Sequence, residues 1–157
     1  DRRQRQMCIR DREMLYEGSR IALLAVGSMV STAEHVREKL KGAGFTCTLA
    51  NGRFIKPVDY GLADRLAKSH ELLVVLEENV LQGGYGLQVK AYVQEHYPEV
   101  QVLTIALPDA YVEHGNVSVL RQELGIDSDS VIRTMRKTWA PLEDAMKGII
   151  EEKEENK

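Results

Sequence analysis

The sequence has no long apolar run, and its longest stretches, Ile21–Val26 and Leu72–Leu76, are far shorter than the roughly 20 residues of a membrane-spanning helix. It has no excess of positive charge either, because 21 Lys and Arg face 24 Asp and Glu and the net charge is −3. That balance lacks the basic footprint of a nucleic-acid-binding protein. No charged and then apolar leader opens the chain, so we expect a cytoplasmic protein.

Cysteine and histidine are sparse. The two cysteines, Cys8 and Cys47, are too few for a disulfide framework and lack the spacing of a zinc site. The four histidines are scattered, and no two of them stand four residues apart, as two zinc ligands on one helix would. We therefore expect free thiols and no metal site.

What the chain does have is an alternation of short apolar runs and amphipathic segments. Hydrophobic residues make up 43% of the chain and charged residues 29%, as in an ordinary globular domain. The pattern predicts strands at 21–26, 45–49, 72–76 and 100–105, and helices at 31–43, 59–68, 87–96, 116–124, 128–135 and from 141 onward. This order predicts an α/β fold, with three αβα layers around a mostly parallel sheet of about five strands.

We expect the sheet to be built around Leu72–Leu76. Five adjacent apolar residues without alternation indicate a strand buried on both faces, as central parallel strands are. Polar residues begin at Glu77, so we expect the strand to end there and to meet solvent or another protein surface. In open α/β sheets the working crevice lies outside the carboxyl ends of the strands, so the loop that follows is the candidate functional edge.

Gly83, Gly84 and Gly86 in that loop predict a tight turn before the next helix. A helix N-terminus can cradle phosphate, but this spacing matches neither G-x-G-x-x-G nor a Walker loop. Glu77 and Glu78 would also repel a phosphate group. These two neighbours point in opposite directions on an extended chain, so we expect no acid/base pair, but one side chain at an interface and the other at a helix end.

Two further groups of polar residues stand in predicted loops. Arg53 and Lys56 follow the second strand, where an ion pair is favoured over the binding of a ligand carboxylate. Asp109, Glu113 and His114 form a titratable cluster, for which a hydrogen-bonded surface or interface role is favoured over catalysis. The sequence thus yields no catalytic constellation, but a set of candidate interface and loop residues: Ser28, Arg53, Lys56, Glu77, Glu78, Gly83, Gly84, Gly86, Asp109, Glu113 and His114.

The two ends of the chain differ from its middle. Residues 1–15 are polar and basic without periodicity, and Met7–Arg12 resembles the translation of a transposon end used in sequencing-library preparation. A native linker and an assembly artefact both explain this segment, so it is left out of the fold prediction, and we expect the chain to be a piece of a longer protein. We place one domain at 16–137 and a helical tail, with a fraying end, at 138–157.

Four stretches resemble, in order, the C-terminal domain of transketolase-like enzymes. They are Tyr16–Val30, Asn51–Asp59 (N-x-R-F-x-K-P-V-D), Ser69–Gly86 (S-H followed by E-E-N-x-x-x-G-G-x-G) and Leu107–Gly115 (L-P-D-x-Y-V-E-H-G). The last form, with Leu124–Asp127 after it, is similar to the 1-deoxy-D-xylulose-5-phosphate synthase branch of that family. The departures from the family pattern are Gly52, Asn79 and Leu87.

The resemblance implies a parent enzyme that condenses pyruvate with glyceraldehyde 3-phosphate, releases carbon dioxide and feeds isoprenoid, thiamine and pyridoxal synthesis. It implies thiamine diphosphate and Mg²⁺ as cofactors, bound by two upstream domains whose motifs these 157 residues lack. We therefore expect an inactive chain that holds no cofactor, docks on the cofactor-binding and pyrimidine-binding domains, and contributes to a homodimer. Two alternatives stay open: a stand-alone nucleotide or small-ligand sensor that uses the glycine loop, and the same domain of another transketolase-like enzyme.

Overall fold

The computed structural model describes residues 14–27, 29–52, 60–80, 84–107 and 127–156. The strands are β1 (Met14–Tyr16), β2 (Arg20–Ala25), β3 (Thr48–Asn51), β4 (His70–Val80) and β5 (Gln101–Leu107). The helices are α2 (Met29–Gly42), α3 (Tyr60–Ser69), α4 (Tyr85–His96), α6 (Ser128–Thr138) and α7 (Ala140–Glu155).

The five strands form one sheet in the order β1-β3-β2-β4-β5. β2 is parallel to both β3 and β4, and β4 is parallel to β5, whereas β1 is antiparallel to β3. β4 therefore lies inside the sheet, and its apolar run Leu72–Leu76 is fully buried. The predicted α/β class and the mostly parallel sheet of five strands are confirmed.

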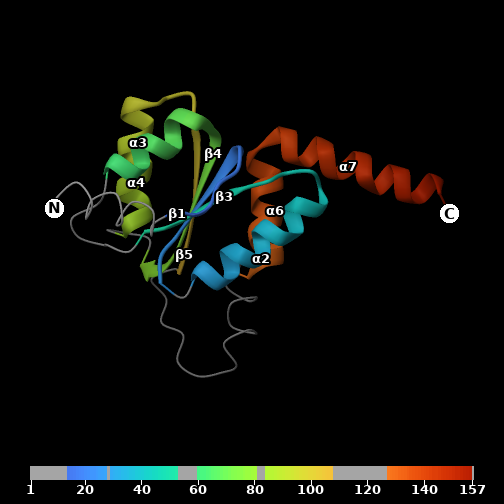
Figure 1. The fold of residues 1–157 in the computed structure, drawn as a ribbon, viewed down its shortest axis with the longest axis horizontal. Coiled ribbons are helices and arrows are strands. Elements are labelled where there is room, and N and C mark those ends of the chain that lie inside the picture. Colours follow the sequence, from blue (N-terminus) through green and yellow to red (C-terminus); the bar gives the residue numbers. More distant parts are fainter. Residues whose placement is uncertain (1–13, 28, 53–59, 81–83, 108–126, 157) are drawn as a thin grey trace, which may run out of the picture.

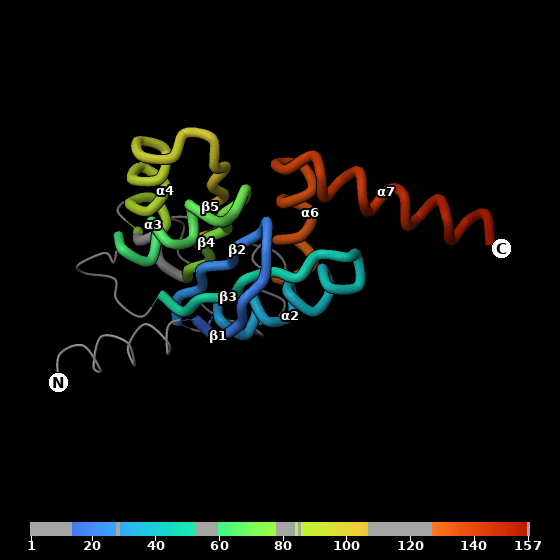
Figure 2. Tube along the Cα trace, turned by 45° about the horizontal axis from the view of Figure 1, so that its top comes forward, coloured from blue at the N-terminus to red at the C-terminus, as the bar shows by residue number. Residues whose placement is uncertain are grey.

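Helices cover both faces of the sheet (Figure 1). α2 and α6 lie on one face, where Leu23 and Val74 contribute to one hydrophobic cluster. α3 and α4 lie on the other, where Leu24 and Val75 contribute to a second cluster. Successive strand side chains thus enter opposite cores, as the pleat of a sheet requires. α7 starts beside α6 and then runs away from the body of the domain, as Figures 1 and 2 both show.

Several boundaries differ from the prediction. α2 begins at Met29, two residues before the predicted start at residue 31. β4 continues past Glu77 to Val80, because the Glu77 side chain is buried and hydrogen-bonded rather than exposed to solvent. α4 begins at Tyr85, which places Gly86 in its first turn.

The outer parts of the sheet also differ. β3 starts at Thr48 rather than at 45, and it shows no exposed face because Thr48, Leu49 and Ala50 are all buried. β1 lies partly within the N-terminal segment that was left out of the prediction, and it forms the edge next to β3. The charged tail is helical as far as Glu155, where fraying was expected. Among the described residues, no helix is long and apolar enough to cross a membrane.

Candidate interface at the carboxyl edge of the sheet

The central strands end together at one edge of the sheet. Val26 N donates to Leu76 O at 2.9 Å, and Gly52 N donates to Ala25 O at 2.9 Å, so the ends of β2 and β3 lie beside Leu76 of β4. The chain leaves β2 through Gly27, whose φ of +63° lies in the left-handed region that glycine adopts without strain. Helix α4 starts at this edge, where Gly86 N in its first turn bonds Glu77 of β4.

Glu77 is the residue around which this edge is organised. It has no exposed surface, although it lies in β4 directly after the apolar run Leu72–Leu76. Its Oε1 accepts a hydrogen bond of 2.8 Å from the backbone N–H of Gly86 in the first turn of α4. The N-cap residue Gly84 has no side chain with which to make such a bond. Glu77 therefore caps α4 from the neighbouring strand and places a carboxylate at the positive end of the helix dipole.

Gly86 allows this close contact between strand and helix. A Cβ atom added at Gly86 would lie 3.1 Å from Glu77 Oε1, 3.2 Å from Thr104 Cγ2 and 3.3 Å from Val75 Cγ1. These distances are tighter than ordinary carbon contacts. Gly86 thus favours the close packing of α4 against β4 and β5, whereas residues 81–83 of the predicted turn lie outside the described residues.

The occupied helix end also bears on the phosphate-cradle interpretation. A phosphate at the N-terminus of α4 would need the N–H of Gly86, which already donates to a carboxylate. It would also meet that carboxylate at close range, where like charges repel. The geometry therefore disfavours phosphate binding at the start of α4.

Two large apolar side chains are exposed in the first turns of α3 and α4. Tyr60 is the first residue of α3 and is 41% exposed, and Leu87 is the third residue of α4 and is 42% exposed. Tyr60 also stacks on Tyr92, with the ring centroids 4.4 Å apart, so its ring is held in place.

The structure brings together three of the sequence-predicted residues: Glu77, Gly84 and Gly86. Of the adjacent glutamates, Glu77 turns to a helix end, and Glu78 is described only as part of β4. The other candidates lie outside the described residues: Ser28, Arg53, Lys56, Gly83, Asp109, Glu113 and His114.

Sequence reasoning assigned no role to His70, which organises the opposite edge of the sheet. Its Nδ1 lies 2.8 Å from Leu66 O, which can only accept, so Nδ1 carries the proton. Its Nε2 then accepts from the Thr48 hydroxyl at 2.7 Å, and the same oxygen accepts from Gly18 N at 2.9 Å. Burial holds the pKa of His70 below its ordinary value. The one available signal was the buried position of a Ser-His pair at the start of the central strand.

Cys47, by contrast, is a buried and unreactive thiol. Desolvation raises its pKa to about 12, although the nearby Arg37 acts in the opposite direction. Arg37 Nε donates to the carbonyl of Cys47 at 3.1 Å and does not contact its sulfur in any described bond. The expectation of a free thiol is confirmed for Cys47, and Cys8 lies outside the described residues.

The mostly parallel sheet and its two helical layers define a class that comparison with known proteins identifies. The chain belongs to the transketolase C-terminal domain family, whose model matches residues 11–131. A split-gene transketolase, described as an inactive β4 tetramer, has a TM-score of 0.71 at 24% identity and covers 81% of this chain and 40% of that one. Transketolase from Campylobacter jejuni has a TM-score of 0.52 at 17% identity, covering 79% of this chain and 18% of that one. These two structures show the fold.

More similar relatives are named 1-deoxy-D-xylulose-5-phosphate synthase. That of Lachnoclostridium phytofermentans is 44% identical over 121 residues, which are 76% of this chain and 19% of that protein. Those of Aromatoleum aromaticum and Dehalococcoides mccartyi are 38% and 37% identical over 82% and 87% of this chain, and 20% and 21% of theirs. The chain thus spans about a fifth of the length of these curated relatives. The resemblance noted in the sequence is confirmed.

Proposed function

We propose that the chain is the C-terminal assembly domain of a thiamine-diphosphate-dependent 1-deoxy-D-xylulose-5-phosphate synthase. The complete enzyme condenses pyruvate with glyceraldehyde 3-phosphate, releases carbon dioxide and supplies isoprenoid, thiamine and pyridoxal synthesis in the cytoplasm. The observation that carries this proposal is the identity of 36–44% to relatives of that name over most of the chain.

The carboxyl edge is the surface that docks on the upstream domains. Leu87 and Tyr60 supply exposed apolar area at the start of α4 and α3, and the capped end of α4 holds Leu87 in place. An interface needs such apolar anchors at its centre and polar groups around them. The same domain also contributes to the contact between the two subunits of a homodimer.

The cofactor belongs, in this proposal, to the upstream domains. Among the described residues, no three His, Cys, Asp or Glu side chains lie close enough together to hold a metal ion. Glu77, the buried carboxylate of the carboxyl edge, already binds the start of α4. The described residues do not fit Mg²⁺ or a diphosphate, and in this proposal the chain takes part in the reaction through assembly.

The isolated chain tests the assembly role. With thiamine diphosphate, Mg²⁺ and pyruvate, the purified chain should release no carbon dioxide above the rate without protein, whereas a complete synthase supplies the positive control. Steady decarboxylation by the chain alone would contradict the proposal.

The sensor alternative has its own test. Titration calorimetry with nucleotides and inorganic phosphate should give no saturable heat, because the end of α4 is occupied. A saturable signal that Gly86→Ala abolishes would favour the sensor instead. The coding sequence upstream of this chain separates the synthase from another transketolase-like enzyme.

A further inference from the structure

Helix α7 is longer than its packing on the domain requires. Its first turn is anchored, because Leu142 is fully buried and Ala145 and Met146 pack against the core. The apolar stripe then continues along the helix to Ile149 and Ile150, beyond the point where the core ends. Ile150 is 47% exposed, and Figures 1 and 2 show the outer half of the helix standing clear of the domain. α7 also lies beyond residues 11–131 that match the family.

The outer half of α7, which does not pack on the domain, would be stabilised by contact with another surface. α7 has 16 residues, and a helix of about 15 residues is marginal in water without tertiary contacts. Half-buried Ile149 and exposed Ile150 extend the stripe of Ala145 and Met146 by one turn, and a second surface would cover them. The helix therefore has the properties of an arm that packs against another protein surface.

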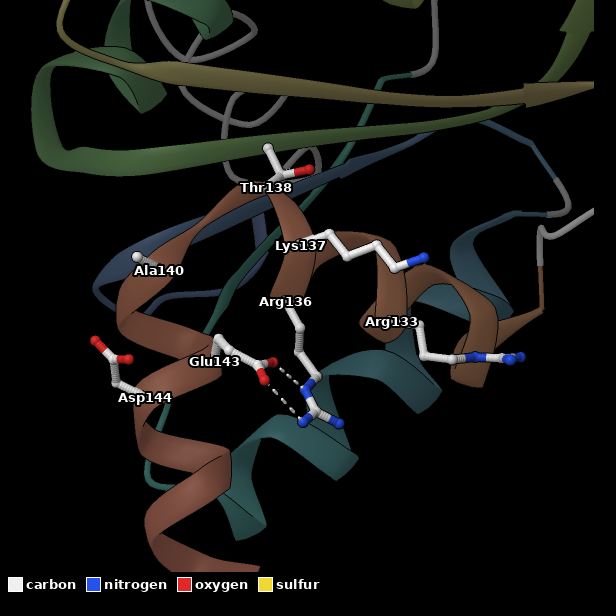
Figure 3. A pocket seen from close by; sticks show the side chains of 7 residues that line it. All are labelled: Arg133, Arg136, Lys137, Thr138, Ala140, Glu143 and Asp144. Atoms are coloured by element: carbon white, nitrogen blue, oxygen red, sulfur yellow. Dashed lines mark hydrogen bonds and ion pairs between the residues drawn. The ribbon is translucent and has the colours of Figure 1, made fainter.

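The charges of the arm identify that surface. Its tip, Glu151–Glu155, contains four glutamates and one lysine, all exposed. We call the end of α6 and the start of α7, residues 133–144, the root of the arm. A hollow of about 610 Å³ lies here between α6 and α7, as Figure 3 shows. Three basic residues line the hollow, Arg133, Arg136 and Lys137, against two acidic ones, Glu143 and Asp144. The arm is thus acidic at its tip and net basic at its root.

The ion pairs at the root leave this polarity in place. Arg136 is held by Glu143, with Nε–Oε2 and Nη2–Oε1 distances of 2.6 and 3.3 Å, and the bond keeps the pKa of Glu143 below its usual value. The exposed side chains of Arg133 and Lys137 point away from Glu143 (Figure 3). Cationic groups at the root therefore remain available to an acidic partner.

We propose that α7 of one chain packs antiparallel against α7 of a second copy. In this two-fold arrangement the axis passes near Ile149 and Ile150, and each acidic tip reaches the basic root of the other copy. A parallel pair would place the two acidic tips side by side, where like charges repel. An anionic membrane is a poorer partner for the same reason, because membrane-surface helices carry basic rather than acidic polar faces. The inference goes beyond the carboxyl-edge docking proposed above and does not depend on it.

Sedimentation of the 157-residue chain over about a hundredfold range of concentration tests the pairing. We expect a reversible monomer–dimer equilibrium. Ile150→Glu should raise the dissociation constant at least about tenfold, because it buries a charge at the axis. Leu15→Glu is the matched control, since Leu15 is 39% exposed but lies on β1, and it should leave the equilibrium unchanged. A monomer at every concentration, or a dimer that Leu15→Glu dissociates and Ile150→Glu does not, overturns the proposal.

Charge reversal tests which ends meet. Lysine at all four tip glutamates should weaken the dimer, and so should Arg133→Glu combined with Lys137→Glu. A chain that carries both sets of changes should recover the wild-type dissociation constant, because tip and root are again opposite in sign. Failure of the combined variant to recover, with circular dichroism showing each variant folded, contradicts the tip-to-root contact.

Disulfide trapping tests the direction of the helices, in a Cys8→Ser background. Ile150→Cys lies near the axis and should cross-link two copies upon oxidation. Glu154 lies one turn beyond Ile150 on the same side of the helix. In an antiparallel pair, the two cysteines of Glu154→Cys would be separated by about 15 Å along the helix axis, at 1.5 Å per residue. It should therefore stay uncross-linked, and efficient cross-linking at 154 would overturn the antiparallel arrangement.

Discussion

Glu77 shows why a polar residue follows the apolar run of β4 directly. A buried carboxylate is costly unless it is hydrogen-bonded. Here it accepts from Gly86 N and satisfies one of the donors that every helix start leaves without a partner in its own helix. The abrupt change from apolar to polar residues at Glu77 therefore marks a capping interaction inside the protein, and not the point where the strand meets solvent.

Replacing Glu77 tests this account. Glu77→Ala should lower the free energy of unfolding by about 1–3 kcal/mol, because a buried N–H loses its acceptor. Glu77→Gln keeps an acceptor oxygen but loses the charge at the helix end, so it should cost less. Urea denaturation measures both, with the exposed Glu95→Ala on the same helix as a control that should change stability by less than about 0.5 kcal/mol. Equal effects of Glu77→Ala and Glu95→Ala would contradict the capping role.

His70 gives the fold a pH dependence with a definite sign. Burial lowers its pKa in the folded state below the ordinary value of 6.5, so the unfolded chain binds a proton more readily. The stabilising contribution is therefore complete above about pH 6.5 and is lost as the pH falls towards the folded-state pKa. Protonation would also force Nε2 to donate to Thr48 Oγ1, whose own proton would then lose its acceptor.

The comparison of His70→Asn with the wild type isolates this effect. Between pH 7.5 and pH 5.5 the wild-type chain should lose more stability in urea denaturation than the variant does. The carboxylates with lowered pKa values, such as Asp64 and Asp129, are common to both proteins and cancel in the difference. A wild-type chain whose pH dependence matches that of His70→Asn would show that His70 does not titrate in this way.

The junction of α6 and α7 is fixed to the sheet by aromatic contacts. Trp139 is the C-cap of α6, is 5% exposed and meets Phe45 edge to face, with the ring centroids 5.7 Å apart. The guanidinium of Arg20 lies 4.9 Å from the centre of the Trp139 ring and forms a 2.6 Å ion pair with Glu71. Arg20 does this with a φ of 67°, which is costly for a residue with a Cβ and indicates that the contacts hold it there.

The two ends of α7 should therefore respond differently to truncation of a side chain. Trp139→Ala should destabilise the chain by about 3–5 kcal/mol, because it empties a buried site between α6 and the sheet. Ile150→Ala removes an exposed side chain and should change the stability of the monomer by less than about 0.5 kcal/mol. Thermal and urea unfolding at low protein concentration measure both. Similar losses would mean that the outer half of α7 packs on its own domain.

The order and type of the described elements could be predicted from the sequence, because each core strand and helix carries its own hydrophobic period. The ends of β4 and α4 could not, since they are decided by the contact between Glu77 and Gly86, which are nine residues apart. The same holds for the edge: β1 is a three-residue strand whose formation depends on pairing with β3. The polar network of His70 joins three segments that only the folded sheet brings together.

At the level of the molecule, the two edges of the sheet differ in kind. The amino edge is closed by the hydrogen bonds of His70 with Thr48 and Leu66. The carboxyl edge carries the capped start of α4 and the exposed Leu87. In the proposed function, this carboxyl edge is the surface that docks on the upstream domains of the enzyme.

A chimeric enzyme tests that claim most directly. The C-terminal domain of the Lachnoclostridium phytofermentans relative is replaced by residues 14–157 of this chain, and synthase turnover is measured with pyruvate and glyceraldehyde 3-phosphate. We predict an active chimera that Leu87→Asp inactivates and that the matched change Glu95→Lys, away from the carboxyl edge, leaves active. An inactive chimera that is folded, or one that Leu87→Asp and Glu95→Lys affect equally, would contradict docking through the carboxyl edge.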